Sequence, residues 1–118
     1  MFGLFKKIEK LDVNEAYQNY LNDPEGIMII NVDELKSYDE RHIMGSENLP
    51  YRLVKDFKEY YPDKSIKYYF YSIMLGKANN AAKAVAKLGY ETYELSDYTF
   101  FKGDEEGLSV KKKRRKKR

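Results

Sequence analysis

Short apolar runs alternate with amphipathic segments along the chain, and this alternation predicts strands separated by helices. Residues 27–32 and 66–71 are continuous apolar or aromatic runs of strand length, which is typical of central strands covered on both faces. Residues 92–95 form a third, shorter strand candidate. Strands that alternate with helices in this way indicate an α/β fold with a central parallel sheet.

Helices are predicted between these strands. Asp12 and Glu15 form a capping-box pattern, and apolar residues then recur on one face as far as Leu21, so the first helix is expected to begin after Asp12. Three further helices are predicted, over residues 33–41, 51–61 and 78–88, the last of them ending at Gly89. The remaining pieces are expected to be a loop over 42–46, an extended segment over 47–49 and a helical turn over 97–101.

The 118 residues suffice for a single domain with one modest core. The chain has no cysteine, which excludes disulfides, thiolate metal sites and cysteine catalysis. With one histidine there is no basis for a metal site, and no cofactor is expected. No apolar run approaches the roughly 20 residues of a membrane span, and the first ten residues lack a secretory pattern. A cytoplasmic location is therefore expected, with a peripheral position at an anionic surface as a further option.

The net charge of +3 combines two parts of opposite sign. The last eight residues are all basic; without them 14 of the 22 basic residues remain against 19 acidic ones, so residues 1–110 carry about −5. The basic tail consists of Lys111, Lys112, Lys113, Arg114, Arg115, Lys116, Lys117 and Arg118. Such a run favours nonspecific attraction to nucleic-acid phosphates or to an anionic membrane, and a solvated tail without a partner is the alternative.

The first ten residues place Phe2, Leu4, Phe5 and Ile8 among lysines. The favoured interpretation is an edge segment that packs on the core and leads into a short first strand. A small amphipathic contact with a membrane or a partner is the alternative.

The loop between the strand at 66–71 and the helix at 78–88 is the first place to look for function. Unpaired backbone amides and the positive end of a helix dipole converge at such a junction. The candidate site residues are Ser72, Ile73, Met74, Leu75, Gly76 and Lys77. Their amides could hold an anion, with Lys77 as the counter-charge. The three apolar side chains either form an exposed docking surface or turn inward and fill the pocket, and the sequence leaves both open.

Five fragments, taken in order and spacing, resemble a single rhodanese-like domain. Residues 29–33 (IINVD) and 42–50 (HIMGSENLP) are similar to the family's "DVR" and "GHIPGAxNIP" signatures. Three more fragments match at residues 62–64, 81–90 and 95–103. The resemblance covers residues 8–103 and implies a three-layer α/β domain with a mainly parallel sheet of about five strands. Residues 1–7 then form a lead, and residues 104–118 a flexible tail.

Active members of this family carry a persulfide on a loop cysteine, and Ser72 stands at that position. A neutral hydroxyl cannot hold a persulfide, and a serine nucleophile would need an adjacent base. Asn31 and Asp33 replace the family's Asp and Arg, and Lys77 replaces the loop arginine. The resemblance therefore implies a non-catalytic protein, expected to act as a protein-interaction module. The alternative is residual sulfurtransferase-like or anion-binding activity at the loop.

Overall fold

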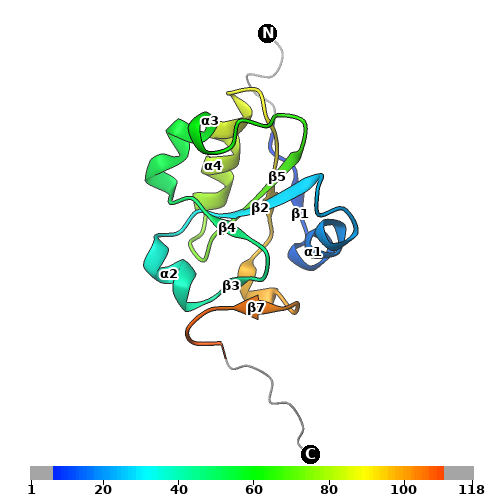
Figure 1. Cartoon of the computed structure of the whole chain (residues 1–118), viewed down its shortest axis with the longest axis vertical. Coiled ribbons are helices and arrows are strands. Elements are labelled where there is room, and N and C mark those ends of the chain that lie inside the picture. The colour runs from blue at the N-terminus through cyan, green and yellow to red at the C-terminus, as the bar shows by residue number, and fades with distance from the viewer. Residues whose placement is uncertain (1–6, 111–118) are drawn as a thin grey trace, which may run out of the picture.

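The structure, a computed structural model, describes residues 7–110. Its strands and helices are shown in Figure 1. In chain order they are β1 (Lys10–Leu11), α1 (Val13–Asn22), β2 (Ile27–Asn31), α2 (Leu35–Glu40), β3 (His42–Ile43), β4 (Glu47–Asn48), the 3-10 helix η1 (Tyr51–Asp56), α3 (Phe57–Tyr60), β5 (Lys67–Tyr71), α4 (Lys77–Ala86), β6 (Glu91–Leu95), the 3-10 helix η2 (Tyr98–Phe100) and β7 (Glu105–Glu106).

Five of the strands form one sheet in the order β1-β6-β5-β2-β4, and every neighbouring pair in it is parallel. The predicted α/β class and the parallel sheet are confirmed. β2 and β5 pair along their whole length, from Ile27 opposite Lys67 to Asn31 opposite Tyr71. Both strands therefore end at the same edge of the sheet, and the residues that follow them leave side by side.

Helices cover both faces of the sheet, so the domain has three layers (Figure 1). Side chains alternate along each strand, and this alternation gives each face its own apolar core. On one face, Ile30 and Phe70 pack with the alanines of α4 and with Phe57 of α3. On the other face, Ile29 and Tyr69 pack with α1 and η2. The continuous apolar runs of β2 and β5 follow from this double burial.

The predicted helix starts and stops are visible as backbone contacts. The carboxylate of Asp12 accepts hydrogen bonds of 3.0 Å from the amides of Asn14 and Glu15, which caps α1. Gly89, expected after the last helix, has a φ of +99° that suits glycine. The segment at 51–61 differs from the prediction, because a 3-10 helix occupies its first part and α3 only its second. The amide of Leu53 bonds to the carbonyl of Pro50, an i→i+3 contact typical of tight first turns.

A second, antiparallel sheet of two strands changes the prediction for residues 42–46. His42 and Ile43 form β3 rather than loop, because they pair with Glu106 and Glu105 of β7. Residues just beyond the predicted domain end at 103 also contact the domain, since the amides of Leu108 and Ser109 bond to the carbonyls of Asp39 and Glu40. Their partners lie more than 60 residues away in sequence, so no local pattern indicates these contacts.

Tyr71 connects this small sheet to the main one. Its hydroxyl accepts a 2.9 Å hydrogen bond from the amide of Ile43 and shares another of 2.9 Å with the hydroxyl of Ser46. Burial raises the pKa of Tyr71 to about 12. The end of β5 is thereby anchored directly before the candidate loop.

His42 is held in place by contacts with its neighbours in the fold. Its ring stacks on that of Tyr38 at 3.7 Å, Nδ1 bonds to the carbonyl of Tyr38 at 2.6 Å, and Nε2 lies 3.3 Å from a carboxylate oxygen of Glu106.

Within residues 7–110, no helix is both long and apolar enough to cross a membrane.

Candidate functional site

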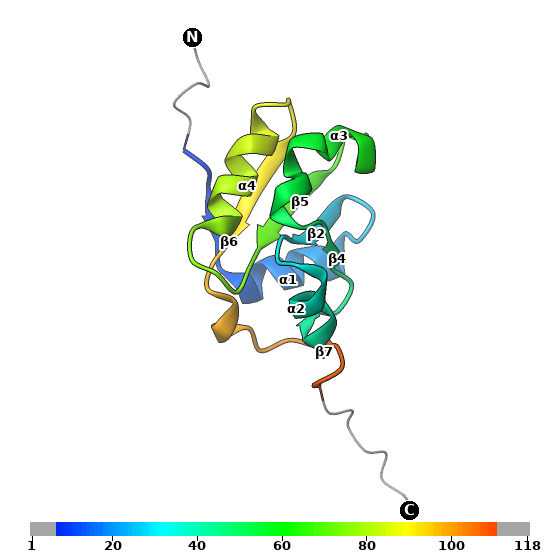
Figure 2. The same cartoon turned by 90° about the vertical axis from the view of Figure 1, so that its left-hand side faces the viewer.

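The loop predicted over residues 72–77 connects the carboxyl end of β5 to the N-terminus of α4, and it ends at Gly76 because Lys77 is the first residue of α4. Figure 2 shows it at the end of the sheet that also carries α2. Gly76 precedes α4 with a φ of +81°, and apart from its neighbours along the chain no atom of residues 7–110 lies within 4 Å of the place where its Cβ would be. Glycine is favoured there by the backbone conformation and not by lack of space.

Ser72 makes two hydrogen bonds through its hydroxyl. The oxygen Oγ donates to Oδ1 of Asp33 at 2.5 Å and accepts from the amide of Met74 at 2.8 Å. Its single proton is therefore directed at a carboxylate. No histidine lies beside this hydroxyl, because His42, the sole histidine of the sequence, is held in the second sheet.

Asp33 lies directly beneath the loop and is only 2% exposed. Its Oδ2 accepts hydrogen bonds from the amide of Ile73 at 3.0 Å and from the side-chain amide of Asn31 at 3.2 Å. The amide of Asp33 in turn donates to Oδ1 of Asn31 at 2.9 Å. Asn48 of β4 donates to Oδ1 of Asn31 at 3.0 Å and to the carbonyl of Asp33 at 2.8 Å. Two asparagines thus orient a buried carboxylate whose charge is satisfied by hydrogen bonds.

The backbone amides of the loop are partly used within the chain. Ile73 donates to Asp33 and Met74 to Ser72, while Lys77 makes a long contact of 3.4 Å with the carbonyl of Met74. In the described part of the chain, the amides of Leu75 and Gly76 have no hydrogen-bond partner. An anion approaching the loop would find these two amides and the start of α4.

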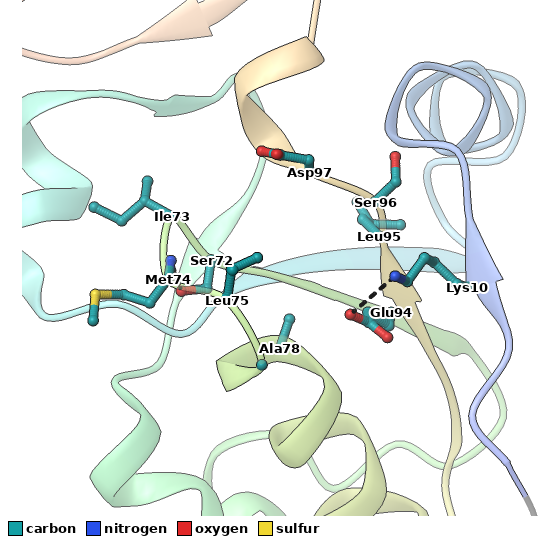
Figure 3. A pocket seen from close by; sticks show the side chains of 11 residues that line it. Lys10, Ser72, Ile73, Met74, Leu75, Ala78, Glu94, Leu95, Ser96 and Asp97 are labelled. Carbon is teal, nitrogen blue, oxygen red and sulfur yellow. Dashed lines mark hydrogen bonds and ion pairs between the residues drawn. The ribbon is translucent and has the colours of Figure 1, made fainter.

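The apolar side chains of the loop are exposed, which answers the question that the sequence left open. Leu75 is 95% exposed, Ile73 56% and Met74 55%. In Figure 3, Ile73 and Met74 extend to the opposite side of the loop from Glu94 and Lys10. All three residues line the pocket, but because they are exposed they do not fill it.

A cavity of about 110 Å³ lies between the loop and the end of β6 (Figure 3). Its charged lining residues are Lys10, Glu94 and Asp97. Lys10 Nζ lies 4.0 Å from Glu94, which also accepts a 3.0 Å hydrogen bond from Asn79. Hydrogen bonds from the backbone amide and then the side chain of Thr99 lower the pKa of Asp97. The wall is thus mainly acidic, and Lys77, the expected counter-charge, is not among its residues.

Asp33 is the residue of this site that sequence reasoning did not place. It was singled out only as a departure from the family pattern. The available signal was positional, because residues that follow neighbouring parallel strands meet at one edge of a sheet. The other predicted site, the basic run from Lys111 to Arg118, lies outside the described residues, and so do Phe2, Leu4 and Phe5 of the predicted apolar start.

Known structures share this fold, although no protein-family model and no curated protein sequence matches the chain. A protein from Anabaena sp. superposes with a TM-score of 0.71 at 22% identity, covering 82% of this chain and 92% of its own. A structure described as rhodanese with anions from E. coli gives 0.61 at 20% identity, covering 70% and 99%. A protein from Bacillus halodurans gives 0.65 at 23% identity, and the present chain covers 65% of its length.

These likenesses fall below 25% identity, so they establish the fold alone. The order of the five-stranded sheet, the two helical layers and the loop at the carboxyl end of β5 agree with that fold. The chain is therefore a rhodanese-like domain in its fold, with Ser72 at the start of the loop.

Proposed function

We propose that this chain is a rhodanese-like protein without sulfurtransferase activity that binds a protein partner through residues 73–75. Sulfur transfer requires a thiolate that can hold a persulfide, and the residue at that position is Ser72. The hydroxyl proton of Ser72 is directed at the carboxylate of Asp33. A carboxylate is a far weaker base than an alkoxide, so it leaves the serine hydroxyl protonated. Persulfide chemistry therefore has no atom to carry it.

The observation that supports docking is the exposure of three consecutive apolar side chains at the tip of one loop. Leu75 is almost fully exposed, and Ile73 and Met74 are each exposed by more than half. Leu35, which follows β2, is also 56% exposed, and its chain segment is joined to the loop through Asp33. Contiguous exposed apolar surface commonly marks an interaction site, and methionine adapts to partners of varied shape.

The direct test of the catalytic part is a thiosulfate:cyanide assay on the unmodified chain. The rate is expected to equal that of the reaction without protein. The competing function is residual sulfurtransferase-like or anion-binding activity; its anion-binding part is favoured by the amides of Leu75 and Gly76, which have no hydrogen-bond partner within residues 7–110. Thiocyanate formation above background would overturn the non-catalytic proposal.

Charged substitutions at the loop tip test the docking part. Leu75→Asp and Met74→Asp are expected to reduce association with a second copy or with proteins recovered by affinity capture, because a carboxylate would have to be desolvated in an apolar contact. Folding stability is expected to change by no more than about 0.5 kcal/mol, since both side chains face solvent. Sedimentation and quantitative capture measure association, and urea denaturation measures stability.

Leu108→Asp is the matched control, because Leu108 is 82% exposed and lies after β7, outside the loop. A partner that docks on the loop is lost from the loop variants and retained by Leu108→Asp. If association and stability are unchanged in both loop variants, the docking proposal is wrong.

The basic tail is proposed to attract polyanions. Truncation after Val110 removes eight positive charges, and it is expected to abolish binding to duplex DNA or to vesicles with anionic lipid. For the full chain, affinity for DNA is expected to fall about a thousandfold between 50 and 200 mM salt if six or more phosphates are contacted. Fluorescence anisotropy and vesicle sedimentation measure the two. Binding that survives truncation at moderate salt would contradict the assignment.

A further inference from the structure

The amide-bearing face of the loop already holds a carboxylate that belongs to the chain. Asp33 accepts the amide of Ile73 and the hydroxyl of Ser72, which are the first two donors that the loop offers. We propose that Asp33 determines the ligand specificity of the loop: its carboxylate takes the place of a bound anion, and the loop therefore rejects anionic ligands. This proposal is independent of docking through the exposed apolar side chains.

The contact is produced by the register of the sheet. Asn31 pairs with Tyr71 at the last position of β2 and β5, and the amide of Val32 extends the ladder by bonding to the carbonyl of Tyr71 at 3.1 Å. Asp33 and Ile73 are each two residues beyond that pair. A hydrogen bond between them is the continuation of the parallel pairing into the loop, made by a side chain instead of the backbone.

Asp33 is also held so that it cannot leave this place easily. It is 2% exposed, and its carboxylate has three donors: the Ser72 hydroxyl, the Ile73 amide and the Asn31 side-chain amide. Asn48 fixes Asn31 and the Asp33 carbonyl from the neighbouring strand. Rotating the carboxylate out would break charge-assisted hydrogen bonds in a buried setting, which is costly.

An external anion at the amides of Leu75 and Gly76 would face this buried charge. At an effective dielectric constant of about 20, two like unit charges within roughly 10 Å repel enough to weaken binding by at least about tenfold. Glu94 and Asp97 line the adjacent cavity and add charge of the same sign, opposed by Lys10 alone among the lining residues. The loop geometry favours an anion, and the charges around it oppose one.

Two substitutions at Asp33 separate its charge from its hydrogen bonds. Asp33→Asn removes the charge and keeps an acceptor for the amide of Ile73. Asp33→Ala removes both and frees that amide. Glu34→Gln is the matched control, because Glu34 is the next carboxylate along the chain, is about half exposed and pairs with Arg52 away from the loop amides.

The experiment is a titration with sodium sulfate at constant ionic strength, followed by the amide resonances of Ile73, Leu75 and Gly76. We expect saturable shifts in both Asp33 variants, with an affinity at least tenfold above that of the unmodified chain and of Glu34→Gln. A spectrum with dispersed resonances shows that each variant is folded, and the near-isosteric Asp33→Asn serves if Asp33→Ala does not fold. Sulfate binding by the unmodified chain equal to that of the variants would overturn the proposal, and so would folded variants that bind no sulfate.

Discussion

A chain that carries both Ser72→Cys and Asp33→Asn is expected to transfer sulfur from thiosulfate to cyanide at least tenfold faster than a chain with Ser72→Cys alone. The Asp33 carboxylate lies 2.5 Å from the present hydroxyl oxygen, so it would lie next to the new sulfur atom. A neighbouring negative charge raises the pKa of a thiol, and each unit reduces the thiolate about tenfold at neutral pH. Asp33 would also repel the thiosulfate dianion.

The expected reaction has two steps. The thiolate of the introduced cysteine attacks the outer sulfur of thiosulfate, a new S–S bond forms, and sulfite leaves with the electron pair of the broken bond. Cyanide then attacks the outer sulfur of the persulfide, thiocyanate leaves, and the thiolate returns. The amides of Leu75 and Gly76, which have no partner in the described part of the chain, are available to the transferred sulfur.

The chain with Ser72→Cys and Glu34→Gln is the control, since it loses one carboxylate that does not touch the loop amides. Thiocyanate formation measures all three variants. Equal rates for the single and double variants would show that Asp33 does not limit the reaction. No activity in any of them would show that the loop has lost the geometry as well as the thiol.

Phe57→Ala is expected to lower the free energy of unfolding by about 3–5 kcal/mol, the usual cost of emptying a large aromatic site. Phe57 is fully buried, and its ring meets those of Tyr68 and Tyr90 edge to face at 5.0 and 4.9 Å. It also contacts the ring of Tyr61 at 5.1 Å. Its removal would empty the centre of an aromatic cluster that joins α3 to the sheet, and urea denaturation measures the loss.

Because domains of this size have only about 5–15 kcal/mol of stability, Phe57→Leu is the companion variant that is expected to stay folded. Phe100→Ala is the exposed control: with 66% of its surface exposed, it is expected to cost about 0.5 kcal/mol or less. A Phe57→Ala chain as stable as Phe100→Ala would contradict the role assigned to this cluster.

The elements of the main sheet could be predicted from sequence because their signals are local. The apolar runs at 27–32 and 66–71 became β2 and β5, and residues 92–95 fall within β6. Asp12 caps α1 as its pattern predicted. Burial on both faces requires continuous apolar strands, and a helix start requires an acceptor for its free amides. Both requirements act within a few residues, so both leave a readable pattern.

The position of the loop could also be predicted, but the exposure of its side chains could not be predicted from a local pattern. Serine at position 72, where the family has cysteine, indicated that the loop has no thiol, because that conclusion depends on one side chain. Whether Ile73, Met74 and Leu75 face solvent depends on what packs against them, and only the structure shows that they do. The pairing of β3 with β7 likewise joins segments more than 60 residues apart.

The sequence by itself determined the long strands of the main sheet, the capped helix and the absence of a thiol, because each follows from residue type and local spacing. Only the tertiary structure decided that the carboxylate of Asp33 bonds to the hydroxyl of Ser72 and the amide of Ile73 in the loop. Ser72 and Asp33 are 39 positions apart, and they meet because β2 and β5 pair in a register that brings Asp33 beside Ile73. A shift of that register by one residue would turn the carboxylate to the other face of the sheet. The register of the sheet, and not the composition of the chain, therefore placed the negative charge of Asp33 at the loop, where the backbone amides would otherwise bind an external anion.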